Sequence, residues 1–112
     1  MAQKLYKPLL IDSITAKAYL PKQRFVGFDG NICAAGAKAL GICDVETDAN
    51  QQAPVAVSGI LLIETASAIT QGYKICSDSN GKAVQVAGAE EVNGYALDTA
   101  SNAGDIIRIL RV

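Results

Sequence analysis

The chain has 112 residues, half of them hydrophobic, with six aromatic residues and no histidine or tryptophan. This length suits one domain, whose core has to be built from Ile, Val, Leu and Ala. The longest apolar stretch, Ile60–Ile63, is far shorter than the roughly 20 residues that a membrane-spanning helix needs, so we expect no membrane association. No apolar segment follows the first lysines as it would in a secretion signal, so we expect a protein that is made in the cytoplasm and either stays there or leaves by lysis or assembly.

The formal net charge of −1 conceals an uneven distribution along the chain. Residues 1–24 carry five basic side chains against one acidic one, whereas the remainder carries ten acidic and five basic side chains. The basic segment has neither interleaved aromatic residues nor a nucleic-acid-binding motif, so we predict no nucleic-acid partner. Docking on an acidic protein surface and ordinary solvated charge both remain open.

The predicted elements are short strands separated by turns rich in Gly, Asn and Asp. The first ten residues have no clean period and contain Pro8, which predicts an extended or irregular arm. Gly59 is expected to end the strand before it, and only residues 64–72 and 89–93 could form short helical turns. Strands are predicted at residues 24–28, 32–34, 40–45, 55–57, 60–64, 73–76, 83–86, 95–97 and 106–112. This spacing predicts an all-β fold, either a compact barrel or a sandwich.

Residues 14–57 resemble residues 63–109 at an offset that drifts from 50 to 53 positions. The aligned pairs include Gly36/Gly88, Gly41/Gly94, Glu46/Asp98, Thr47/Thr99, Asn50/Asn102 and Val55/Ile107. A long period used twice predicts two similar β units that close one core, with chance matching of Ala and Gly as the alternative. We therefore predict a single domain of residues 1–112, made of an N-terminal arm (1–11), a first unit (12–59) and a second unit (60–112).

Residue types that carry chemistry are mostly missing. Without histidine there is no common general base or nitrogen metal ligand, and no phosphate-binding loop or serine-hydrolase motif is present. The three cysteines, Cys33, Cys43 and Cys76, form no C-x-x-C pair and are expected to be buried thiols. The repeated acid-Thr-x-x-Asn element is expected to stabilise turns through side-chain bonds to the backbone. We predict neither an enzyme nor a metal or other cofactor.

Lys82 leads to an alternative function. It follows Gly81 in a predicted hairpin, and biotinyl and lipoyl carrier domains carry their modified lysine at a hairpin tip. The surrounding sequence, SNGKAV, differs from the M-K-M or D-K-A context of those carriers. A small carrier or binding module with Lys82 at a hairpin is the alternative, and a cofactor mass on Lys82 would identify it.

A succession of turns and apolar steps extends over residues 13–112. It runs from an "ITA" segment through "VSGI" and "AITQGYKICSDSNGKAV" to a final "GYALDTA" that leads into Gly104-Asp105 and the C-terminal residues. This succession resembles the capsid cement, or head decoration, proteins of tailed bacteriophages and prophages. The resemblance implies a small β protein on the outside of an icosahedral head, usually a homotrimer, that clamps neighbouring major capsid proteins. It also implies location in the virion, on the capsid surface, after synthesis in the host cytoplasm.

The N-terminal arm is the segment that we expect to contact the capsid. It lies outside the repeat and combines apolar with cationic residues, which would be unusual for a free tail. We expect it to lie extended on a neighbouring surface, with backbone pairing to an edge strand, and with Tyr6 and Leu9 in pockets. Its lysines would add salt-sensitive attraction to an acidic patch. The candidate capsid-binding residues are Lys4, Leu5, Tyr6, Lys7, Leu9 and Leu10. The alternative is that the arm covers its own domain.

Overall fold

The computed structural model describes residues 6–112, which form eight strands and no helix. The strands are β1 (Lys7–Thr15), β2 (Phe25–Val26), β3 (Gly41–Cys43), β4 (Gln52–Glu64), β5 (Lys74–Ser77), β6 (Ala83–Gln85), β7 (Gly94–Ala96) and β8 (Ile106–Arg111). The all-β prediction is confirmed. The short helical turns that residues 64–72 and 89–93 could have formed are absent: residue 64 ends β4, and isolated bridges, bends, turns and irregular backbone make up the rest of the two segments.

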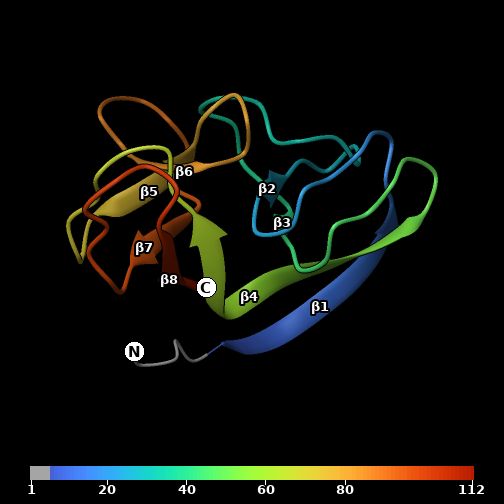
Figure 1. Ribbon diagram of the computed structural model, residues 1–112, viewed down its shortest axis with the longest axis horizontal. Helices are drawn as coiled ribbons and strands as arrows, with labels where there is room; N and C mark the ends of the chain where they lie inside the picture. The colour runs from blue at the N-terminus through green and yellow to red at the C-terminus, as the bar shows by residue number, and fades with distance from the viewer. Residues whose placement is uncertain (1–5) are drawn as a thin grey trace.

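One sheet contains every strand and curls into a nearly closed barrel (Figure 1). Neighbouring strands follow the order β2-β3-β4-β8-β7-β5-β6, and β1 pairs with β4 outside this path. All these pairings are antiparallel. Strand β4, with 13 residues, is the longest: its first part pairs with β1 and β3, and its last part pairs with β8. It therefore connects the two halves of the molecule.

The strands enclose two clusters of buried apolar side chains, dominated by Ile, Val, Leu and Ala as the composition predicts. The larger cluster combines residues of both halves: Phe25, Cys33, Ala39, Ile42, Ala56, Leu61, Ile63, Ile69, Ile75, Ala83, Ala96, Ala100, Ile107 and Ile109. The smaller cluster belongs to the first half: Ala16, Leu20, Val26, Cys43, Ala53 and Val55. Because one cluster draws on both halves, the two halves share a core.

Backbone hydrogen bonds repeat between the two halves. Leu20 and Thr47 each donate an N–H to the carbonyl of the other, at 2.8 and 2.9 Å, and Ile69 and Ala100 do the same, at 2.9 and 2.8 Å. The offset between equivalent positions is 49 residues for the first partner and 53 for the second. The two halves therefore use the same pairing scheme, in agreement with the repeat in the sequence.

Gly41 and Gly94 have the same role in this scheme. Each begins a three-residue strand, β3 or β7, and each pairs with an apolar residue, Val26 or Ile75. A Cβ atom at Gly41 would collide with the carbonyl oxygen of Ala56, and one at Gly94 would lie 2.8 Å from Cδ1 of Ile109. The obstacle at Gly41 is backbone, so glycine is required there, whereas at Gly94 it is the end of a side chain and a larger residue is disfavoured by close packing.

The structural alignment differs in detail from the one that residue identities favour. Cys43 and Ala96 each lie two residues beyond the equivalent glycines, and they pair with Val55 and Ile109 respectively. Val55 therefore corresponds to Ile109 and not to Ile107. The alignment by strand pairing thus differs by two residues from the alignment by residue identity. Two residues are one full period of a strand, so either alignment puts the same side chains of this strand on the buried face.

The predicted strand break at Gly59 is wrong, because β4 continues through it. Gly59 has φ of +114°, a conformation that favours glycine, and it pairs with Pro8 on one side and Arg111 on the other. The glycine therefore changes the course of the strand without ending it. The predicted boundary between the two units, at residues 59 and 60, therefore lies inside a continuous strand.

Candidate docking surface

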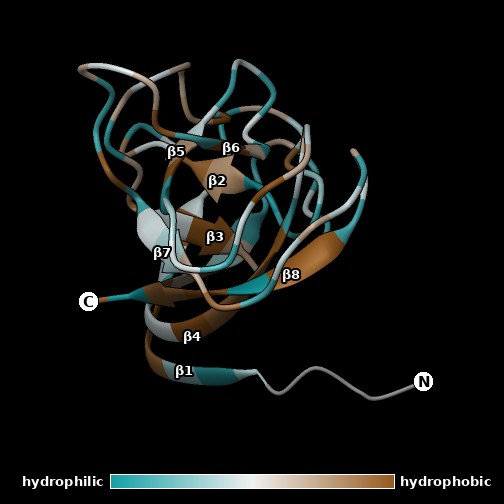
Figure 2. Ribbon diagram, turned by 90° about the vertical axis from the view of Figure 1, so that its left-hand side faces the viewer, coloured by the Kyte–Doolittle hydropathy of each residue, from teal (hydrophilic) through white to brown (hydrophobic). Residues whose placement is uncertain are grey.

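Strand β1 lies at the margin of the molecule (Figures 1 and 2). Within residues 6–112 it pairs only with β4, so its other edge carries no strand. Seven of its nine residues are exposed, on both faces of the strand. The segment expected to be an extended or irregular arm is therefore an edge strand from Lys7 onward, paired with β4 of its own chain. An open edge of this kind can pair with the backbone of another protein.

Two register shifts interrupt the pairing of β1 with β4. One lies between Pro8 and Leu10, and the other lies between Leu10 and Ile11. Leu9 has no partner opposite it and is 82 % exposed, while Leu10 and Ile11 are 54 % and 48 % exposed. Pro8 lacks an N–H group and is tolerated here because the strand is at the edge. The bulge thus presents a consecutive apolar triplet to the outside.

The six candidate capsid-binding residues have different surroundings. Lys4 and Leu5 lie outside the described residues. Lys7, Leu9 and Leu10 are exposed on β1. Contact of these six residues with a capsid stays a prediction.

Tyr6 differs from the other candidates because its side chain contacts its own chain. It is half-buried against the larger core cluster, and its hydroxyl lies 2.5 Å from both carboxylate oxygens of Asp44. Burial, followed by this hydrogen bond and the negative charge of Asp44, raises the pKa of the Tyr6 hydroxyl. In this conformation Tyr6 attaches β1 to the end of β3 instead of projecting outward.

The outer face of the sheet carries a row of five residues that lie directly opposite one another on adjacent strands. Across β5, β7, β8, β4 and β1 the row reads Lys74, Tyr95, Leu110, Ile60 and Lys7. Directly opposed residues have their side chains on the same face, and their neighbours Ile75, Ala96, Ile109 and Leu61 are buried on the other face. We call this set the outer row. It has an apolar centre with a lysine at each end.

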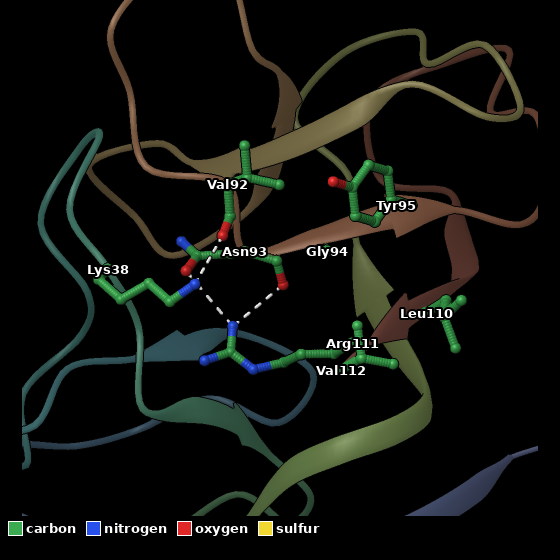
Figure 3. A pocket seen from close by; sticks show the side chains of 8 residues that line it. All are labelled: Lys38, Val92, Asn93, Gly94, Tyr95, Leu110, Arg111 and Val112. Carbon is green, nitrogen blue, oxygen red and sulfur yellow. Dashed lines mark hydrogen bonds between the residues drawn. The ribbon is translucent and has the colours of Figure 1, made fainter.

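A pocket of about 230 Å³ adjoins the outer row (Figure 3). Lys38 lies on one side of it, and Tyr95, Leu110 and Val112 lie on the other. Lys38 donates a hydrogen bond from Nζ to the carbonyl oxygen of Val92, at 2.9 Å, and its side chain is otherwise exposed. Of the residues between 6 and 112 that line the pocket, none has an acidic side chain.

Arg111 forms part of the pocket wall and is only 8 % exposed. Its guanidinium donates to the carbonyl oxygens of Val57 and Asn93, at 2.8 and 3.0 Å, and to those of Ala39 and Leu40. All these acceptors are neutral, and burial lowers the pKa of the Arg111 guanidinium. Arg111 therefore joins the two halves of the molecule. Each face of β8 carries one arginine, and nothing in the sequence indicated that Arg111 is buried while Arg108 is on the outward face.

Lys82 is not at the tip of its hairpin. Its Nζ lies 3.2 Å from Oε2 of Glu64, and Arg24 contacts the other carboxylate oxygen of Glu64 at 3.5 Å. Asp78 closes the turn by accepting the backbone N–H groups of Asn80 and Lys82. A lysine held in a partly buried ion pair is poorly placed for attachment of a cofactor, so these contacts do not favour the carrier alternative.

The three cysteines are buried and free, as predicted, and burial raises the pKa of each thiol. Within the described part of the chain, no group of three or more Cys, Asp or Glu side chains could hold a metal ion. Residues 6–112 contain no helix long and apolar enough to cross a membrane.

Comparison with known proteins identifies the family. No curated protein matches the chain, but the sequence model of the phage cement protein family matches residues 8–111, almost the whole chain. Among solved structures, the N base of the head fiber protein gp8.5 of bacteriophage phi29 has a similar fold, with a TM-score of 0.76. The two chains are 17 % identical over 92 % of this chain and 93 % of the other. The chain therefore belongs to the phage cement protein family.

Proposed function

We propose that this protein binds the outer surface of a phage head and stabilises the lattice of the major capsid protein. The observation that carries the proposal is the open edge of β1, with its bulged apolar triplet Leu9, Leu10 and Ile11, in a chain of the cement family. An edge strand supplies backbone donors and acceptors in register, and adjacent apolar side chains supply buried area. The protein would accordingly be located on the capsid surface of the virion.

Repetition over the shell compensates for a small contact. Each copy needs only a modest interface, because a lattice offers the same site many times and linked copies bind with a high effective concentration. A copy that bridges two capsid subunits resists their separation. A homotrimer would contact three subunits at once, and we expect this state, with subunit contacts through strand edges or the apolar C-terminal residues. Light scattering of the free protein and its copy number on heads, in multiples of three, test it.

Co-sedimentation with purified heads that lack the protein tests head binding. Leu9→Asp should weaken binding at least about tenfold, because it places a charge in the buried part of the interface. The fold should be retained, since Leu9 is largely solvated in the free protein. Phe28→Asp is the matched control, because Phe28 is also an exposed apolar side chain, at 69 %, in the turn after β2.

Three outcomes distinguish the possibilities. Loss for Leu9→Asp alone supports the proposal. Equal loss for both variants contradicts the specific role of β1. Failure of the unaltered protein to bind heads contradicts the proposed function itself.

A further inference from the structure

The outer row and its pocket form a second candidate contact, distinct from the edge of β1. We propose that this face docks on an apolar strip of the head shell that is bordered by carboxylates, with one acidic side chain entering the pocket beside Lys38. The inference rests on the proposed function and names the chemistry of the partner surface. It follows from the charges on the face, the shape of the face and the arrangement of its lysines.

The face is cationic, although the chain as a whole has a net charge of −1. Lys7, Lys74 and Lys38 surround it, and none of the three forms an ion pair with another residue of the described range 6–112. The nearby carboxylate of Asp98 accepts from the Arg108 guanidinium at 2.9 Å, so a base already compensates its charge. Three uncompensated cations around an apolar centre attract a surface with the complementary arrangement.

The centre of the face has the composition of an interface core. Tyr95 and Leu110 lie within strands β7 and β8 and are 41 % and 36 % exposed, and Ile60 continues the apolar strip toward β1. Tyrosine and leucine flanked by lysines match the usual pattern of an apolar core with a charged rim. The pocket beside them is large enough for one side chain. A carboxylate that enters it meets Lys38 at the opening and the buried charge of Arg111 in the wall.

The arrangement of the lysines disfavours a two-fold contact between copies of this chain. In such a contact the outer row would face its own copy in the reverse direction, so that Lys7 of one copy would lie near Lys74 of the other. Like charges at both ends of an interface weaken it. The end of the row at Lys7 also lies on β1, so the face and the proposed edge contact can engage one surface together.

The test combines charge reversal with a charge-preserving variant. In co-sedimentation with heads that lack the protein, the triple variant K7E/K38E/K74E should bind more than about tenfold more weakly, since three attractions become repulsions. The triple variant K7R/K38R/K74R should bind within about twofold of the unaltered protein, and should show the same decrease in binding as salt rises. K17E/K22E, which reverses two exposed lysines elsewhere, is the control for a general effect of charge. Circular dichroism checks the fold of every variant.

Each result has a definite meaning. If the unaltered protein binds heads and the glutamate triple variant binds equally well, the proposed face is wrong while the proposed function stands. If the triple variant instead loses self-association in light scattering, the face is occupied by a second copy and the proposal is overturned. If the control K17E/K22E loses as much binding as the triple variant, the attraction is general and not specific to this face.

Discussion

Strands β1 and β8 both pair with β4, yet their side chains are used differently. In β8 the side chains alternate: Ile107, Ile109 and Arg111 are buried, while the residues between them face outward. In β1, seven of nine residues are exposed, and the bulge at Leu9 disrupts alternation. A strand that contributes little to the core can change its surface at little cost in stability, so β1 is suited to contact a partner while the inward face of β8 maintains the fold.

Arg111→Met should produce the largest effect and would sharpen this contrast. The substitution removes the guanidinium that donates to the carbonyl oxygens of Val57, Asn93 and Ala39, so we expect a loss of about 3 kcal/mol in the free energy of unfolding. Urea unfolding measures it. Arg108→Met, on the outward face of the same strand, should cost less, about 1 kcal/mol, because its partly buried ion pair with Asp98 remains in contact with water. Equal losses in the free energy of unfolding for the two variants would show that the inward and outward faces of β8 contribute equally to stability.

Deletion of residues 2–9 tests β1 from the other direction. It removes Tyr6 with its bond to Asp44 and the beginning of β1, so we expect a folded protein that is less stable by about 1–2 kcal/mol. The same protein should no longer bind heads in co-sedimentation. Failure to fold, or binding with unchanged affinity, would contradict the division of roles between β1 and β8.

Tyr6→Phe removes only the hydroxyl and should cost about 1 kcal/mol at neutral pH. The raised pKa of Tyr6 in the folded protein means that the protonated hydroxyl stabilises the fold below the unfolded pKa, about 10. This contribution is lost as pH rises from there toward the folded pKa. The difference in urea midpoint between the unaltered protein and Tyr6→Phe should therefore shrink above about pH 10. A difference that does not change with pH would contradict the link to Asp44.

Leu9→Ala should have the smallest effect, a change within about 0.5 kcal/mol, because the side chain is already largely in water. Ile109→Ala in β8 is the comparison, with an expected loss of about 2–5 kcal/mol from a buried site. Thermal or urea unfolding of both variants measures the pair. A large loss for Leu9→Ala would mean that β1 is part of the structural core.

The sequence predicted the strands that combine apolar runs with clear turns. The strands after Tyr73 and Asn93 were found to within about two residues, because glycines and asparagines mark their ends. Glycines also made the repeat visible, because Gly41 and Gly94 occupy equivalent positions where an adjacent strand lies close. β1 was not recognised as a strand, because Pro8 and the bulge at Leu9 disturb the two-residue period that identifies one.

The acid-Thr-x-x-Asn elements show where side-chain roles could be anticipated. Thr47 donates its hydroxyl hydrogen to the carbonyl oxygen of Val45, and Asp98 accepts from the backbone N–H of Arg108. The first contact lies within one turn, as this residue pattern suggested, whereas the second spans ten positions and joins the loop after β7 to β8. The outer row could not be anticipated, because its five members come from five strands and depend on the register of four separate pairings. Single-sequence patterns contain no information about register between distant strands.

The continuity of β4 has a consequence for how the chain folds. Ile60 pairs with Lys7, 53 positions earlier, and Gly59 pairs with Arg111, 52 positions later, so the central strand must close two long loops. Such separations correspond to slow folding, on the order of milliseconds to seconds. Neither half can complete its hydrogen bonding without a strand that also belongs to the other half. We therefore expect one cooperative folding transition that begins only after β8 has left the ribosome, with no stable half-length product.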